Sequence, residues 1–273
     1  MNRLLKVLLS LNSLRKAIGI NSFFAATKFD HHLQISPDLN FQKILVLAPH
    51  PDDEVFGAGG LLVKLAQKQR EITVAYFCDG SGGIPEKNYQ ALSQRNEKEE
   101  LGQRIDHDLN LIEIRKSEAK KSAAILGLKE QIFFGYRDGR LAAGQAAFKA
   151  LNDLIERVKP DIILTPSFLD NHPDHRAVNE VLVNSDIDNK DFEIWAYEVW
   201  TPIFVNRIVD ISAVIEKKKT AIDAHASQLK SRRYDRAIIG LNQYRAELNG
   251  LTGFAEGFFA TTFEIYQKLY QKS

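Results

Sequence analysis

Several features are scarce in this sequence of 273 residues, and each scarcity excludes a class of protein. Cys78 is the single cysteine, so the chain forms no internal disulfide, which fits a reducing compartment such as the cytoplasm. Neither sign of charge is in excess, because 36 lysines and arginines balance 35 aspartates and glutamates. A net charge of +1 gives no reason to expect a nucleic acid as the partner.

The N-terminal segment is basic and rich in leucine, yet it lacks a long apolar run. Lys6 interrupts the run early, and Ser10 and Asn12 interrupt it again. A signal peptide needs about 7–15 uninterrupted apolar residues, and a membrane-spanning helix needs about 20. We expect residues 1–40 to form an extension with an amphipathic helix that packs on the domain. The alternative is that residues 1–25 lie on the cytoplasmic face of a membrane, with basic side chains near the headgroups.

Strand-like and helix-like patterns alternate along the rest of the chain. Short apolar runs predict strands over residues 43–47, 71–77, 131–136, 161–166, 192–200, 206–212 and 257–266. Helical spacing and charge patterning predict helices over residues 59–69, 143–158 and 213–230 and most of 93–122. Such alternation is typical of a parallel sheet with crossover helices.

We therefore expect one α/β domain over residues 41–273, Rossmann-like and built in three layers, with a mostly parallel sheet and helices on both of its faces. The chain contains no repeat, low-complexity tract or linker rich in proline and glycine that would divide it. Residues 85–113 depart from the alternation and are dense in charges of both signs. We interpret them as an insertion, placed where a lid could lie.

Two segments carry most of the residues suited to chemistry, and each follows a predicted strand. A His-Pro-Asp-Asp-Glu motif occupies residues 50–54, and a His-Pro-Asp-His motif occupies residues 172–175, within a loop expected at 167–179. In an open parallel sheet, ligands bind outside the carboxyl ends of the strands. We therefore expect the two motifs at the same edge of the sheet.

The clustered acids of the first motif indicate a metal, because neighbouring carboxylates repel one another unless a positive group holds them. A catalytic zinc takes three ligands from His, Asp and Glu and keeps one position for water. His50, Asp53 and His175 make such a set. Asp52 is then left beside the metal, where it could act as general base for the attacking water. His172 is also left over and could donate a hydrogen bond to the oxyanion of a tetrahedral intermediate.

Three other interpretations stay open at this point. The acids at 52–54 could simply stabilise the N-terminus of a helix, where the helix dipole favours negative charge. Two histidines and one carboxylate also form the iron site of non-haem oxygenases, although that site usually lies on an all-β barrel. A sugar-binding module without catalysis is the third, but it would have no use for a spare base.

Taken together, the two motifs resemble those of the PIG-L / LmbE-like zinc deacetylases, over roughly residues 42–230. Members of this family remove the acetyl group from N-acetylglucosamine conjugates, including N-acetylglucosaminyl-phosphatidylinositol and intermediates of mycothiol and bacillithiol synthesis. The resemblance therefore implies an amino-sugar substrate, either a small molecule or a glycoconjugate. Some members act on non-sugar amides, so a metal-dependent amidase of that kind is the alternative.

The resemblance also implies a role for each residue of the two motifs. His50, Asp53 and His175 match the zinc ligands, and iron or cobalt can often replace zinc in such a site. Asp52 matches the general base. His172 matches the residue that stabilises the oxyanion or acts as an acid.

Further positions match the family less specifically. Asp174 matches a carboxylate that orients the site, and Glu54 has only a supporting role. Arg115, in the segment Arg-Lys-Ser-Glu, and Asp138, in the segment Gly-Tyr-Arg-Asp-Gly-Arg-Leu, match residues that face the sugar. His225 lies in a His-Ala-Ser-Gln segment similar to a late family motif, and either packing or a role in the site would explain it.

Overall fold

The computed structural model describes residues 33–35, 37–82, 97–230 and 232–273. The amphipathic helix expected within residues 1–25 lies outside this part of the chain, and so do residues 85–96 of the expected insertion. Among the described helices, none combines the length and the apolar character needed to cross a membrane.

Within the described residues, eight strands form one sheet in the order β1-β7-β8-β6-β5-β2-β3-β4. Their bounds are β1 (Gln34–Ile35), β2 (Lys43–Ala48), β3 (Glu71–Cys78), β4 (Glu130–Tyr136), β5 (Ile162–Pro166), β6 (Glu193–Tyr197), β7 (Arg207–Asp210) and β8 (Ala255–Thr262). All neighbours are parallel except β8, which runs antiparallel to both β6 and β7. The expected, mostly parallel sheet is therefore confirmed, and β1, from the expected extension, pairs with β7 at one edge.

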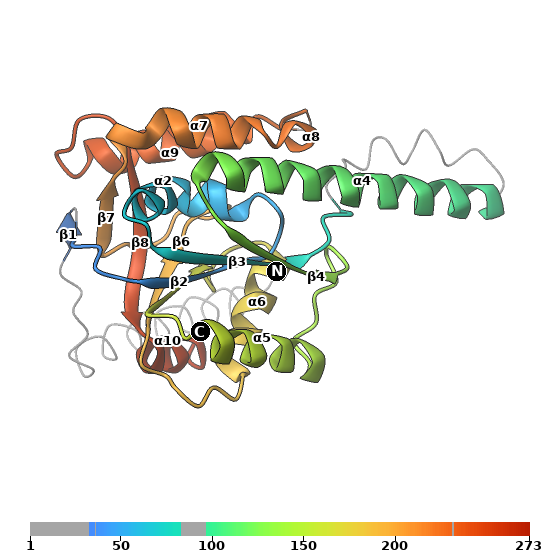
Figure 1. Ribbon diagram of the computed structural model, residues 1–273, viewed down its shortest axis with the longest axis horizontal. Coiled ribbons are helices and arrows are strands. Elements are labelled where there is room, and N and C mark those ends of the chain that lie inside the picture. Colours follow the sequence, from blue (N-terminus) through green and yellow to red (C-terminus); the bar gives the residue numbers. More distant parts are fainter. Residues whose placement is uncertain (1–32, 36, 83–96, 231) are drawn as a thin grey trace, which may run out of the picture.

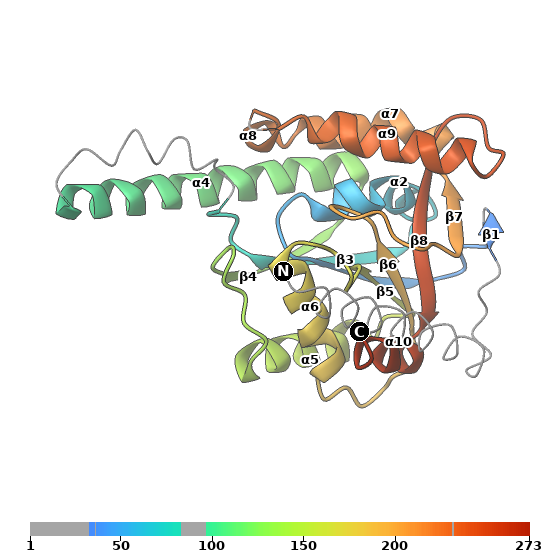
Figure 2. The ribbon, with the colours of Figure 1, turned by 180° about the vertical axis from the view of Figure 1, so that it is seen from behind.

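Helices cover both faces of the sheet, as expected (Figures 1 and 2). On one face lie α2 (Asp53–Gln67), α4 (Glu97–Leu126), α7 (Ile215–Asp223), α8 (Ala226–Leu229) and α9 (Tyr234–Glu247). On the other lie α5 (Gln145–Val158), α6 (Pro173–Asn184) and α10 (Phe263–Tyr270), and a short 3-10 helix, η1 (Ser212–Val214), precedes α7. The three-layer architecture thus follows from helices that cover both faces of the sheet with apolar surface.

The central strand β2 shows why the core has two halves. Ile44 and Val46 pack into the core beneath α2, whereas Leu45 and Leu47 pack into the core beneath α5 and α6. All four are fully buried. A parallel strand covered on both faces is apolar at every position, which explains why the sequence there is a continuous run rather than an alternation.

Several predicted boundaries were wrong. The last strand was expected over 257–266, but it ends at Thr262, whose hydroxyl accepts a hydrogen bond from the Ile265 N–H and caps α10. The helix expected from residue 59 starts at Asp53. The helix expected over 213–230 is divided into η1, α7 and α8.

A further error concerns the segment after β5, which was expected to be a loop over 167–179. Instead, α6 begins at Pro173, with His172 as its N-cap residue. Proline is common at the first position of a helix, because its missing N–H has no partner to lose there. The second motif therefore spans a helix N-terminus.

Helix α4 confirms the helical prediction for the charged segment from residue 97 onward. Its C-terminal half packs on the core through Ala119, Ala123 and Leu126, all fully buried. Its N-terminal half extends beyond the rest of the domain (Figure 1). A lid role for residues 85–113 stays a prediction.

Close packing holds α2 against the sheet. A Cβ atom at Gly57 would lie 2.1 Å from the Tyr197 ring, and one at Gly60 would lie 2.5 Å from Ile211. Only glycine fits at these two positions, because any side chain would push the helix away from β6 and from the segment after β7.

A fully buried ion pair also contacts the middle of α2. Lys218 Nζ lies 2.7 Å from Glu256 Oε1, and neither side chain is exposed. The Glu256 carboxylate accepts hydrogen bonds from the Gly60 and Leu61 N–H groups, at 2.7 and 2.8 Å. Lys218 donates to the Phe56 carbonyl at 3.0 Å. The pair thus joins α7 and β8 to the backbone of α2.

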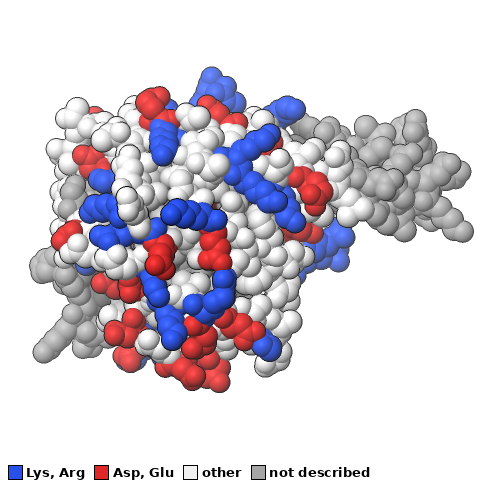
Figure 3. Space-filling model, in the orientation of Figure 1, with Lys and Arg blue, Asp and Glu red and all other residues white. Residues whose placement is uncertain are grey.

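The surface carries charges of both signs. On the face shown in Figure 3, basic and acidic side chains are interspersed, in keeping with the net charge of +1.

Candidate metal centre and its cavity

The two predicted motifs meet at the carboxyl ends of β2 and β5, which are adjacent strands. A cavity of about 510 Å³ opens there. Six of the eight predicted site residues line it, namely His50, Asp52, Asp53, Arg115, Asp138 and His172. The other two, Asp174 and His175, are buried directly behind this lining, with 1% and 0% of their surface exposed.

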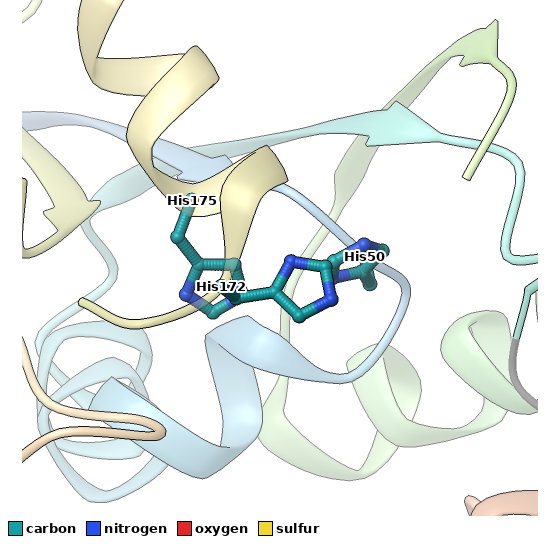
Figure 4. A group of neighbouring side chains, drawn as sticks. All are labelled: His50, His172 and His175. Carbon is teal, nitrogen blue, oxygen red and sulfur yellow. The ribbon is translucent and has the colours of Figure 1, made fainter. Parts of the chain in front are cut away.

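Three histidines converge at the buried end of the cavity (Figure 4). Each of His50, His172 and His175 offers one ring nitrogen, and these three atoms lie within 4.8 Å of one another. The Asp53 carboxylate lies beside them, since its Oδ2 atom is 3.1 Å from His50 Nδ1 and 3.2 Å from His175 Nε2. The structure therefore brings the three predicted ligands together, with His172 as a further nitrogen donor in reach.

The state of these groups fits a divalent metal. Both ring nitrogens of His175 are buried and make no hydrogen bond among the described residues, although Nδ1 lies 3.5 Å from Asp170 Oδ1. Burial alone would raise the pKa of Asp53, but His175 and His50 hold it well below its usual value, so the carboxylate is ionised. Two imidazoles and one carboxylate match the donor set of a catalytic zinc.

Asp174 supports the orientation of His50 from behind. Its Oδ2 atom lies 3.0 Å from His50 Nε2 and accepts a hydrogen bond from the Gly139 N–H at 2.7 Å. Its Oδ1 atom accepts from the Leu141 N–H at 3.2 Å. A carboxylate behind a histidine ligand fixes the orientation of the ring, and here the carboxylate is itself held by two backbone groups.

Asp52 is the N-cap residue of α2, but its side chain makes no hydrogen bond to the helix. Instead, its Oδ2 atom lies 2.9 Å from the Arg115 guanidinium. Burial raises the pKa of Asp52 to about 6, against the opposing effect of Arg115. Helix capping therefore does not account for Asp52.

Arg115 and Asp138 form the polar wall of the cavity. Arg115 donates to the Gly80 carbonyl at 3.0 Å and lies 3.4 Å from Asp138 Oδ2. Gly80 has φ +79°, and a Cβ there would lie 2.9 Å from the Arg115 side chain, so glycine is required. Burial opposes ionisation of Asp138, but His50 and Arg115 lower its pKa to about 2.

An aromatic wall completes the cavity, and the sequence motifs did not reveal it. Phe56, Trp200 and Tyr234 line it. The Trp200 and Tyr234 rings meet edge to face at 5.2 Å, and Phe56 lies 5.8 Å from Tyr234. Trp200 follows β6, so the rule that ligands bind at the strand ends could have found it. No comparable signal marks Phe56 or Tyr234.

Glu54 and His225 lie outside the cavity lining. Glu54 is buried within α2, accepts a hydrogen bond from the Tyr76 hydroxyl at 2.9 Å, and has a pKa raised to about 8 by burial. His225 is fully buried at the N-terminus of α8, and burial lowers its pKa to about 3, with a further contribution from nearby Arg115. Its place in the core favours packing over a role in the site.

Comparison with known proteins places this geometry in a family. Residues 45–185, which are more than half of the chain, match the family described as "PIG-L: GlcNAc-PI de-N-acetylase". This chain belongs to the PIG-L family. The expected family membership is thereby confirmed.

Several relatives of this PIG-L protein are named as deacetylases. A diacetylchitobiose deacetylase from Thermococcus kodakarensis is 28% identical over 209 residues, covering 70% of this chain and 72% of that protein. A probable N-acetyl-alpha-D-glucosaminyl L-malate deacetylase 2 from Bacillus anthracis is 26% identical and covers 71% and 84%. Both names describe amino-sugar deacetylation.

A solved structure shares the fold as well. The N,N'-diacetylchitobiose deacetylase from Pyrococcus horikoshii, in complex with its inhibitor, superposes with a TM-score of 0.67 at 25% identity. The match covers 83% of this chain and 86% of that one. The expected three-layer α/β fold is therefore confirmed beyond the 45–185 segment.

Proposed function

We propose that this PIG-L protein is a metal-dependent N-deacetylase that hydrolyses the acetamide of an N-acetylglucosamine-type conjugate and releases a free amine and acetate. The observation that carries the proposal is the Asp53 carboxylate between His50 and His175, with the unligated Asp52 carboxylate beside it in the same cavity. The names of its relatives support the reaction class.

His50, Asp53 and His175 would hold the metal in this proposal. Their nitrogen and oxygen donors suit zinc, and Fe²⁺ or Co²⁺ could replace it. When bound, the ion supplies Lewis acidity toward the water and the acetamide carbonyl. Asp174 keeps the His50 ring in position through its contact with Nε2.

Asp52 acts as general base and takes a proton from the attacking water. Its pKa of about 6, raised by burial, leaves it mostly ionised at neutral pH yet basic enough to accept a proton. Arg115 fixes the carboxylate through its contact at 2.9 Å. After the attack, protonated Asp52 donates that proton to the leaving amine. Asp52 thereby returns to its ionised form.

His172 stabilises the oxyanion as a neutral donor. Its Nδ1 atom accepts a hydrogen bond from the Asp174 N–H at 3.2 Å, which places the ring proton on Nε2. Burial, together with the nearby His50 and His175, lowers the pKa of His172 and favours this neutral form. Since His172 lines the cavity, its Nε2–H is available to a developing negative oxygen.

The two walls of the cavity suit a pyranose ring. Hydroxyl groups around the ring would meet Arg115 and Asp138, while its C–H faces would pack on Trp200 and Tyr234. A volume of about 510 Å³ lies within the usual range for small-molecule sites. The walls thus favour an amino sugar over a simple aliphatic amide.

Amine release from a panel of N-acetylglucosamine conjugates tests this proposal, with the protein metal-free and then zinc-reconstituted. His175→Ala should lose both bound metal and turnover, because it removes one of three ligands. His225→Ala, which removes another buried histidine that does not line the cavity, should keep one metal per chain. Metal content by elemental analysis checks both variants.

Two results would contradict the proposal. Unchanged metal content in His175→Ala would refute the ligand set. Full zinc occupancy without release from any conjugate would refute the reaction.

A further inference from the structure

One charged group in the cavity forms no ion pair within the described part of the chain. Asp52 and Asp138 lie within 3.4 Å of Arg115, and Asp53 contacts His50 and His175. Arg232 also lines the cavity, yet no carboxylate of the described residues forms an ion pair with it. A guanidinium left without an anion in a binding cavity is the natural partner for a charge on the ligand.

The neighbouring Arg233 differs from Arg232, because it does have a carboxylate partner. Arg233 lies next to it and binds the Asp235 carboxylate through two hydrogen bonds, at 2.6 and 2.9 Å. The Arg232 backbone is held on both sides, because its N–H donates to the Gln228 carbonyl and its carbonyl accepts from the Tyr234 N–H. Arg233 therefore binds the first turn of α9, whereas Arg232 lines the cavity.

The depth of the groups indicates which part of a substrate would meet Arg232. Asp52 and His50 are each only 6% exposed, whereas Arg232 is exposed. If the proposed function holds, the acetamide must reach the buried end. Arg232 then faces the opposite part of the substrate, which leads out of the cavity.

We propose, on the basis of the proposed function, that Arg232 binds an anionic oxygen group, a phosphate or a carboxylate, on the aglycone of the amino sugar. The planar guanidinium suits both groups, since either can accept two parallel hydrogen bonds. The enzyme is thereby selective for negatively charged conjugates. Arg115 does not serve this purpose, because the Asp52 and Asp138 carboxylates already balance its positive charge.

Three N-acetylglucosamine conjugates test this proposal on the zinc-loaded enzyme: the neutral methyl glycoside, the 1-phosphate and a glycoside ending in a carboxylate. Arg232→Gln should lower kcat/KM for the two anionic conjugates by about tenfold, mainly through KM, and change the methyl glycoside by less than about twofold. The matched control, Arg233→Gln, should leave all three unchanged. The preference of the native enzyme for the anionic conjugates should weaken with added salt.

The outcomes separate this proposal from the function on which it rests. Deacetylation of all three conjugates at similar rates, or an equal loss on all three in Arg232→Gln, would overturn the role of Arg232 and leave the deacetylase intact. If none of the conjugates is deacetylated, their binding measured by calorimetry still tests whether Arg232 forms an anion site. Tighter binding of the anionic pair that Arg232→Gln abolishes supports the anion site, and equal binding refutes it.

A final arm distinguishes a substrate group from a free anion. Inorganic phosphate should compete only weakly with the 1-phosphate conjugate. Competition as strong as that of the conjugate itself, lost in Arg232→Gln, would assign the site to free phosphate and overturn the substrate preference.

Discussion

Two buried ion pairs contact helix α2, and their surroundings differ. Asp52 and Arg115 meet at the N-terminus of α2, where both line the cavity. Lys218 and Glu256 meet at its middle, where neither is exposed at all. The first pair faces a space that a ligand can enter, whereas the second is enclosed by protein.

The partners of each pair explain the difference. Glu256 accepts from two backbone groups of α2, and Lys218 donates to a third and to the Asn242 side chain of α9, so this pair joins α2 to its neighbours. Asp52 has no bond to the helix, and burial raises its pKa to about 6. Burial alone therefore does not mark a candidate catalytic group. For Asp52, burial is combined with a place in the cavity wall.

The largest expected effect comes from removing the base at the open pair. Asp52→Asn should lower kcat by roughly 10²–10⁴ while zinc content and the melting temperature stay close to those of the native protein. Asparagine keeps the size of the side chain, and Arg115 keeps the Asp138 carboxylate and the Gly80 carbonyl as partners. Steady-state kinetics, elemental analysis and thermal unfolding check this together. Turnover within a few-fold of the native enzyme would remove Asp52 from the mechanism.

Breaking the enclosed pair should act on stability instead. Lys218→Met leaves the Glu256 carboxylate buried without its cation, which should cost about 3–5 kcal/mol of the free energy of unfolding. The double variant Lys218→Met, Glu256→Gln should lose less than the single one, since no unpaired charge remains. Urea unfolding measures the stability of both variants. A Lys218→Met variant as stable as the native protein would contradict a stabilising role for this pair.

The smallest effect belongs to an exposed pair, which completes the comparison. Lys149 and Asp153 lie one turn apart on α5 and are 75% and 64% exposed. Lys149→Ala should change the free energy of unfolding by less than about 0.5 kcal/mol, because water and salt screen the attraction. Urea unfolding under the same conditions checks this. A loss of unfolding free energy comparable to that of Lys218→Met would mean that burial does not decide how much an ion pair contributes to stability.

Much of the fold and of the candidate site could be predicted from local patterns. The apolar run at 43–47 and its counterpart at 161–166 indicated parallel strands, and residues after such strands must gather at one edge. That rule placed the two motifs together before any contact was known. The boundaries at Asp53, Pro173 and Thr262 were missed because each depends on a helix N-terminus, where caps and packing outweigh periodicity.

The sequence by itself determined the class of fold, the family and the residues that converge as candidate ligands, because periodicity and strand-end position are local properties. Only the tertiary structure decided which distant segments surround them. The cavity joins side chains from α2, the segment after β6, the α8–α9 turn and the first residue of α9, namely Phe56, Trp200, Arg232 and Tyr234. They share a cavity because of the strand order and helix packing. No local pattern encodes that order, since it depends on long-range burial across the whole chain.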